Sequence, residues 1–192
     1  MLKNYPILAA ITIASAPLAA CAMTPEGGSD MATTATVGGA AMYSSRTIVE
    51  NAANSRDHTT LVAAVKAAGL VETLSGSGPF TVFAPTNAAF ARLPAGTVDS
   101  LLKAENRSSL QSVLTYHVVP GRVTARDLVG LIEAGGGEAR VTTVQGGVLT
   151  ARLAGNQVVL VDANGGTARV SQADVMQSNG VIHVTDAVSI PS

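Results

Sequence analysis

The sequence predicts an α+β domain in which short helices come first and antiparallel strands follow. Apolar residues recur at helical spacing from Ile48 onward, whereas beyond Glu138 short Val- and Thr-rich runs alternate with Gly and Asn turns. Between these halves, the run from Phe80 to Phe90 (FTVFAPTNAAF) joins a buried strand directly to a helix start. Helices followed by antiparallel strands indicate α+β rather than a doubly wound parallel sheet.

Residues 1–21 have the features of an export signal. Lys3 supplies a weak positive charge, and residues 7–18 form an apolar run too short to span a membrane comfortably. The run ends in Leu-Ala-Ala-Cys, the pattern of a bacterial lipoprotein signal, so we expect the thiol of Cys21 to receive a lipid. An ordinary cleaved signal peptide is the alternative. The prediction is an exported protein of the cell envelope, lipid-anchored or secreted, with Ala22 favouring the outer membrane.

A flexible linker is predicted for residues 22–43, and one folded domain for residues 44–192. The linker segment is rich in Gly, Thr and other small residues, and no apolar period persists in it. Such a tether would let the domain stand off the bilayer.

Apolar residues at helical spacing mark the helices that precede Gly135. Thr59 or Thr60 is expected to cap the second helix, and Gly69 to end it. The positions that mark these helices are Ile48, Val49, Ala52 and Ala53; Leu61, Val62, Val65 and Ala68; Val98, Leu101 and Leu102; Leu110, Val113 and Leu114; and Leu128, Leu131 and Ile132.

The FTVFAPTNAAF run predicts a strand that is packed on both faces and closed by Pro85, which cannot donate to a ladder. Thr86 and Asn87 can each accept a backbone N–H of the following helical turn, which places Phe90 on the core side.

The second half is predicted to be a β-meander. Strands are expected over residues 139–145, 148–154, 157–162 and 167–171, because Gly and Asn in the short loops supply the positive φ angles of tight hairpins. Asn179-Gly180 then leads into a last strand over residues 181–184.

Composition and motif spacing favour no enzyme, metal or nucleic-acid chemistry. Without Lys3 the chain carries 11 Lys+Arg against 13 Asp+Glu, a net charge of −2, and it has no basic tract for nucleic acid. His58, His117 and His183 do not have metal-ligand spacing, and Ser75-Gly76-Ser77-Gly78 lacks the form of a nucleophile elbow. We expect no catalytic residue, metal or cofactor.

Three segments resemble blocks of the fasciclin (FAS1) domain family. They are FTVFAPTNAAF, the segment LTYHVVPG at residues 114–121, and NGVIHVTD at residues 179–186, and the similarity covers about residues 44–192. The resemblance implies a FAS1 fold, an antiparallel β-sandwich or wedge with a bundle of short helices packed against it. It also implies an exported or surface-exposed protein that serves in adhesion.

The resemblance further implies four candidate partner-binding residues. Tyr116 and His117 occupy the Tyr-His segment that is associated with integrin binding in animal relatives, and Asp174 and Val175 occupy the place of their Asp-Ile motif. The alternatives are structural: His117 would be a buried, hydrogen-bonded imidazole in an apolar strand, and the Asp174 segment would be a tight turn with Val175 and Met176 covering the core.

The leading functional hypothesis is a non-enzymatic, envelope-anchored module for adhesion that binds a surface protein or a polysaccharide. The alternative is a carrier of an apolar small molecule such as a carotenoid. That reading rests on the scarcity of large side chains, with no Trp and three Phe, which could leave an apolar groove.

Overall fold

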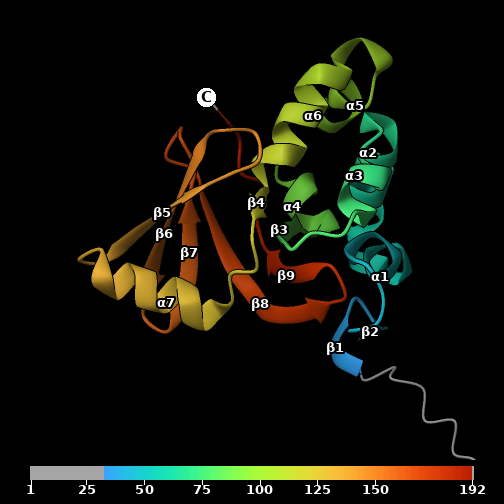
Figure 1. The fold of residues 1–192 in the computed structure, drawn as a ribbon. Coiled ribbons are helices and arrows are strands. Elements are labelled where there is room, and N and C mark those ends of the chain that lie inside the picture. The colour runs from blue at the N-terminus through green and yellow to red at the C-terminus, as the bar shows by residue number, and fades with distance from the viewer. Residues whose placement is uncertain (1–32, 192) are drawn as a thin grey trace, which may run out of the picture.

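The structure is a computed structural model that describes residues 33–191. The predicted signal peptide, Cys21 and residues 22–32 of the predicted linker lie outside the described residues. Figure 1 shows most helices gathered beside one part of a curved sheet, with one further helix, α7, under the other part. The predicted α+β fold with helices packed against a wedge is confirmed.

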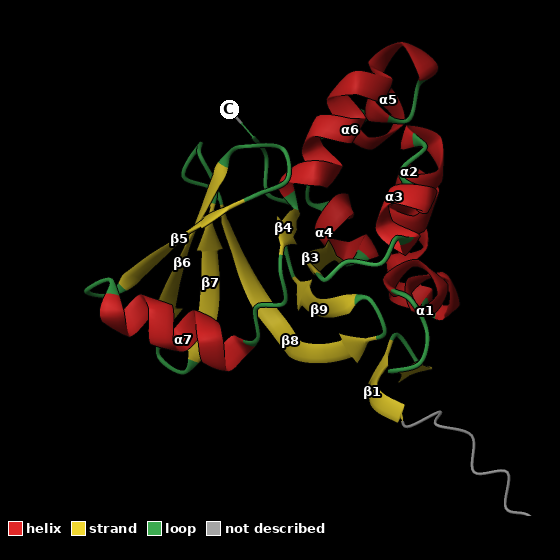
Figure 2. Ribbon diagram, in the orientation of Figure 1, coloured by secondary structure: helices red, strands yellow, loops and turns green. Residues whose placement is uncertain are grey.

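The helices are short, and most of them lie between residues 48 and 116 (Figure 2). Two 3-10 segments, Arg56–His58 and Ala104–Asn106, connect them. The helices are α1 (Ile48–Asn54), α2 (Thr59–Ala68), α3 (Val71–Ser75), α4 (Asn87–Ala91), α5 (Thr97–Leu101), α6 (Arg107–Tyr116) and α7 (Ala125–Ala134).

The strands form a two-stranded hairpin, β1-β2, and a seven-stranded sheet in the order β4-β3-β9-β8-β7-β6-β5. The bounds are β1 (Thr33–Val37), β2 (Ala40–Tyr43), β3 (Phe80–Pro85), β4 (Val118–Pro120), β5 (Glu138–Thr142), β6 (Val148–Ala154), β7 (Gln157–Val161), β8 (Thr167–Gln177) and β9 (Gly180–Thr185).

One pair in the large sheet is parallel. β3 and β9 run side by side from Phe80 opposite Gly180 to Pro85 opposite Thr185, whereas the other neighbours are antiparallel. The prediction of antiparallel strands did not include this pair. Its two strands are about a hundred residues apart in the chain, and local alternation of apolar residues carries no information on such a pairing.

The central strand β3 separates two apolar cores. Val82 and Ala84 face a cluster shared with α1, α2, α3 and α6, whereas Phe83, 1% exposed, faces the inside of the wedge. There it meets Leu128 and Ile132 of α7 across the inner residues of β5–β8. The alternation predicted for a strand buried on both faces is confirmed.

The two edges of the sheet meet at one end of the wedge. The loop after β5 folds back onto the other edge, where the Val144 N–H donates to the Val118 carbonyl at 2.7 Å and the Gln145 N–H donates to Thr115 O at 3.3 Å. The inner face of the strands is therefore enclosed, and only their outer face is open to solvent.

Part of the segment predicted to be a linker is folded. Residues 33–43 form the hairpin β1-β2, which buries Val37 and Met42 to 5% and 2% exposure in the helix-side core. Gly38 and Gly39, with φ of 58° and 75°, make the two-residue turn, and Gly38 lies against Ser55, where a Cβ would clash. The composition of the segment resembled a tether because this turn and its small neighbours are also what a linker contains.

The Tyr-His segment is not the start of a strand. Tyr116 is the last residue of α6 and His117 caps that helix, so that β4 has only three residues. The apolar residues up to Pro120 have strand character, but α6 extends through Tyr116, so only Val118–Pro120 form a strand.

The Asp174 segment is not a turn either, because β8 continues through it to Gln177. A bulge between Gln172 and Val175 places Asp174 at φ 56°. The extra residue changes which side chains face the core, as bulges do.

The predicted caps are confirmed in part. The hydroxyl of Thr86 accepts from Ala89 N at 3.3 Å and starts α4, and Gly69 ends α2 in the left-handed region. Neither Thr59 nor Thr60 caps α2, since Asn87 does so from α4. Its Oδ1 accepts from Thr60 N at 3.0 Å.

Candidate functional site

His117 is held between the end of α6 and the C-terminal segment. Its Nδ1 donates to Val113 O at 2.8 Å, and its Nε2 accepts from Ser189 N at 3.0 Å. These partners require the neutral ring protonated on Nδ1, because the Ser189 N–H can only donate. The ring is buried, and burial lowers the pKa of His117 below its ordinary value. The alternative interpretation of His117 as a buried, hydrogen-bonded imidazole describes its environment.

Tyr116 joins α6 to the far strands of the sheet. Its side chain is 1% exposed, and its hydroxyl donates to Val148 O at 2.8 Å and accepts from Ala163 N at 3.2 Å. Burial raises the pKa of this phenol. The residue therefore links three parts of the wedge.

Asp174 and Val175 lie on the bulge of β8. Asp174 Oδ1 accepts from the Ala125 N–H at the first residue of α7, at 2.7 Å, and Asp174 N donates to His183 Nδ1 at 3.3 Å. His183 in turn donates from Nε2 to Val123 O at 2.9 Å, and burial lowers its pKa. The bulge thus fixes the start of α7, while the side chain of Val175 is fully buried.

The four predicted binding residues do not form one surface. Tyr116 and His117 lie at the end of α6, whereas Asp174 and Val175 lie on β8 beside the start of α7. Three of the four are buried, and Asp174 is half-buried. In the folded domain a partner has no access to Tyr116, His117 or Val175.

An apolar cavity lies between the helices and the sheet. It is lined by side chains of α1, α2, α3, α6, β3 and β4 and by His117. Its volume of about 30 Å³ is room for one or two water molecules. A long apolar ligand would fit only if these helices moved apart.

Among residues 33–191, no three His, Cys, Asp or Glu side chains come together to hold a metal ion. None of the helices in that range is both long enough and apolar enough to cross a membrane.

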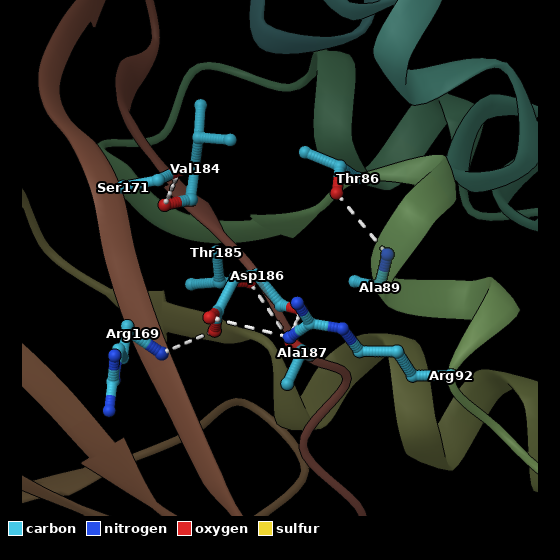
Figure 3. Close-up of polar contacts among 9 residues, drawn as sticks. All are labelled: Thr86, Ala89, Arg92, Arg169, Ser171, Val184, Thr185, Asp186 and Ala187. Atoms are coloured by element: carbon cyan, nitrogen blue, oxygen red, sulfur yellow. Dashed lines mark hydrogen bonds and ion pairs between the residues drawn. The ribbon is translucent and has the colours of Figure 1, made fainter.

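The end of β9 forms a polar junction that sequence reasoning missed (Figure 3). Asp186 accepts from Arg169 N at 2.7 Å through Oδ1, and its Oδ2 lies 3.4 Å from Arg92 Nη1. The same Arg92 Nη1 donates to the Asp186 carbonyl at 2.9 Å. The strand alternation of the closing segment could have placed Asp186 on the outer face, but no local pattern links it to Arg92 or Arg169.

Comparison with known proteins decides the family. The model of the Fasciclin domain matches residues 56–191. The chain belongs to the fasciclin domain family. The predicted membership of the fasciclin family is thereby confirmed.

Two relatives illustrate the range of the similarity. Protein sll1483 of Synechocystis is 52% identical over 157 residues, which cover 82% of this chain and 80% of that protein. The cell surface glycolipoprotein MPB83 of Mycobacterium bovis is 35% identical over 122 residues, or 64% of this chain and 48% of that protein.

A solved structure shares the fold. The FAS1 domain pair of the insect cell adhesion molecule Fasciclin I superposes with a TM-score of 0.67 at 19% identity. The match covers 74% of this chain and spans half the length of that one.

Proposed function

We propose that this protein is a non-enzymatic fasciclin module, anchored in the cell envelope by a lipid on Cys21, that binds a surface protein or a polysaccharide in adhesion. The fasciclin match over residues 56–191 carries the proposal. It is supported by the cell-adhesion molecule that shares the fold and by the cell-surface glycolipoprotein among the relatives.

The chemistry of the histidines supports a non-enzymatic role. His117 and His183 each use both ring nitrogens on backbone partners inside the domain. A general acid or base must reach the proton that it transfers, and neither ring is open to a substrate.

The anchor is tested by processing and fractionation. Wild-type protein and Cys21→Ala are compared in cells with and without globomycin, which blocks lipoprotein signal processing. We expect the Cys21→Ala substitution and globomycin each to prevent maturation to the lipidated form and to change how the protein fractionates with membranes. Unchanged processing and fractionation would show that the protein is not lipid-anchored.

Binding is tested by cross-linking on intact cells followed by purification. The control carries the same signal and residues 22–32 fused to an unrelated folded domain, so that both proteins reach the same compartment. We expect envelope components that cross-link to the fasciclin chain and not to the control. Identical cross-linked products from the two proteins would refute the interaction role.

The apolar cavity supports a second candidate, the carrier of an apolar small molecule such as a carotenoid. The wall is made of aliphatic side chains such as Ile48, Val65 and Leu114, which suits such a ligand, but its volume requires the helices to open. Protein purified from native membranes is examined for pigment and then mixed with carotenoid. A pigment-free protein that takes up none would exclude this function.

A further inference from the structure

The outer face of β5–β8 carries two straight rows of side chains. In the first row, Arg140 lies opposite Thr150, which lies opposite Val161 and then Thr167. Residues directly opposite one another on neighbouring strands point to the same side of a sheet. The inner face of the same strands is covered by α7 and the wedge core, so these rows face solvent.

The second row has charged residues on β5, β6 and β8, with the buried Val159 of β7 among them. Glu138 lies opposite Arg152, and the row continues through Val159 to Arg169. Beyond β8 it reaches Asp186, which exchanges backbone and side-chain hydrogen bonds with Arg169, and then Arg92 of the segment after α4 (Figure 3). We call the surface formed by Arg92, Arg140, Arg152 and Arg169 the outer arginine face.

The guanidinium groups of this face differ in their partners. Arg152 contacts Glu138 Oε2 from Nε at 3.0 Å and from Nη2 at 2.6 Å, and Arg92 pairs with Asp186. Both paired arginines remain more than half exposed, at 56% and 63% of the side chain. The exposed side chains of Arg140 and Arg169 have no ion pair or hydrogen bond among residues 33–191.

The face is basic although the chain is not. Four arginines against Glu138 and Asp186 give 4 − 2 = +2, whereas the whole chain has a net charge of −1. A local excess of positive charge on a flat, solvent-facing sheet attracts an anionic partner.

We propose that the outer arginine face binds an acidic polysaccharide, one whose sugars carry carboxylate or sulfate groups. This inference rests on the proposed function and names the class of partner. The arginines bind the anionic groups. Thr150 lies opposite Arg140, and Thr167 is two residues from Arg169 on the same face of β8, so both hydroxyls are placed for hydrogen bonds to sugar hydroxyls.

The spacing of the arginines favours an extended chain over a compact anion. Arg152 and Arg169 are separated by β7, hence by two strand spacings or about 10 Å. The guanidinium group of Arg152 is paired with Glu138 on β5, the strand farther from Arg169, so the two groups are directed to separate charges, as repeated along a polymer.

The chemistry of the face also argues against other partners. Single-stranded nucleic acid binds through aromatic platforms, and the aromatic residues of the described chain lie on β2, β3, α4 and α6 instead. An interfacial membrane contact inserts large apolar side chains beside the basic ones. On this face the most exposed apolar residue is Val148, at 41%.

The test compares two charge-matched double variants of the purified full chain. Arg140→Gln/Arg169→Gln removes the two unpaired arginines of the face. Arg122→Gln/Arg126→Gln removes two exposed arginines at the start of α7, on the opposite side of the sheet. Binding to immobilised alginate (carboxylate) and heparin (sulfate) is measured over a salt series, with soluble acidic polysaccharide, soluble dextran, phosphatidylglycerol vesicles and a single-stranded oligonucleotide as competitors.

We expect wild-type protein and Arg122→Gln/Arg126→Gln to bind an acidic polysaccharide with equal affinity and to be released by salt. Loss of two exposed charge contacts in Arg140→Gln/Arg169→Gln should weaken binding about tenfold. Neutral dextran should not compete.

Three outcomes overturn the proposal: no binding to either acidic polymer, equal losses in the two double variants, or competition by phosphatidylglycerol vesicles or the oligonucleotide that is stronger than competition by soluble acidic polysaccharide. If the cross-linking experiment still captures envelope components under any of these outcomes, the proposed interaction role stands and only the assigned face is wrong.

Discussion

The interior around Tyr116, His117 and His183 and the outer arginine face use polar groups in opposite ways. In the interior, the phenol and both imidazoles are buried, and each polar atom has a backbone partner. On the outer face, the charged side chains are exposed, and two of the four guanidinium groups have no partner in the described part of the chain.

This difference separates the residues that identify the family from those that could bind. Buried polar groups must be hydrogen-bonded, so the Tyr-His segment and the closing segment fix the positions of the helices and strands around them. Exposed side chains are free of that constraint and can vary on the same scaffold. The fasciclin segments therefore define architecture, and binding is expected on surfaces that they do not include.

The largest expected effect is in the interior. Phe83→Ala removes a ring that is 1% exposed and stacks on His183 with the ring centroids 5.5 Å apart. The lost burial and the remaining cavity should reduce the free energy of unfolding by about 3–5 kcal/mol. Denaturant unfolding measures the change.

Leu131→Ala on α7 is the matched control, because this apolar side chain is 50% exposed. It should reduce the free energy of unfolding by only about 1 kcal/mol, since half of the side chain is already in contact with water. A loss as large as that of Phe83→Ala would mean that α7 packs differently from the structure.

The next effect is a loss of stability in mild acid. Burial lowers the pKa of His58, His117 and His183 below the ordinary value of 6.5, so the unfolded chain takes up protons at a higher pH than the folded domain. Stability is complete above about pH 6.5 and falls as the pH decreases, by up to about 1.4 kcal/mol per pH unit for each histidine that stays neutral.

Urea unfolding at pH 7.5, 6.5 and 5.5 measures this loss. The carboxylates of Glu50 and Asp127 do not interfere, because their hydrogen bonds lower the pKa below 4.5 and 3.8 and their stabilisation is lost only in stronger acid. A free energy of unfolding that stays constant down to pH 5.5 would contradict neutral, buried histidines.

A smaller effect is expected at Asn87, which bonds to the start of α2 from the neighbouring α4. Asn87→Ala removes the acceptor of Thr60 N and the donor to Arg56 O at 2.8 Å. The loss should be about 1–2 kcal/mol, as for a helix cap, in thermal or urea unfolding. Asn156→Ala in the exposed β6–β7 turn, where the side chain makes no hydrogen bond to the described residues, should have little effect. Equal losses at the two sites would refute the capping role.

Asn87 also shows how far the sequence could predict the fold. The residue type and its place after a strand indicated a cap, and Thr86 does cap its own helix. Nothing local indicated that Asn87 would cap a different helix, because that contact depends on how α4 packs on α2. The apolar periods of the strands and helices, like the caps, could be predicted because they depend only on residues near one another in the sequence.

Long-range pairing and backbone irregularities were beyond local reasoning. Contacts between distant segments determine three features that were not predicted. These are the parallel register of β3 and β9, the bulge at Asp174 and the position of Tyr116 at the end of α6. The candidate site was affected most, because the burial of Tyr116, His117 and Val175 follows from those contacts. Arg92 and Arg169 became neighbours only through Asp186 in the folded chain.

The smallest effect on stability is expected from Arg140→Gln/Arg169→Gln. This variant tests most directly whether the interior and the outer arginine face have separate roles. Both side chains are exposed and have no ion pair within residues 33–191, so their loss should change the free energy of unfolding by less than about 0.5 kcal/mol in urea. The same variant is expected to lose acidic polysaccharide binding, whereas Phe83→Ala should lose stability and retain binding wherever it remains folded. A double variant that is strongly destabilised would show that these arginines support the fold, and the distinction between an architectural interior and a binding exterior would then fail.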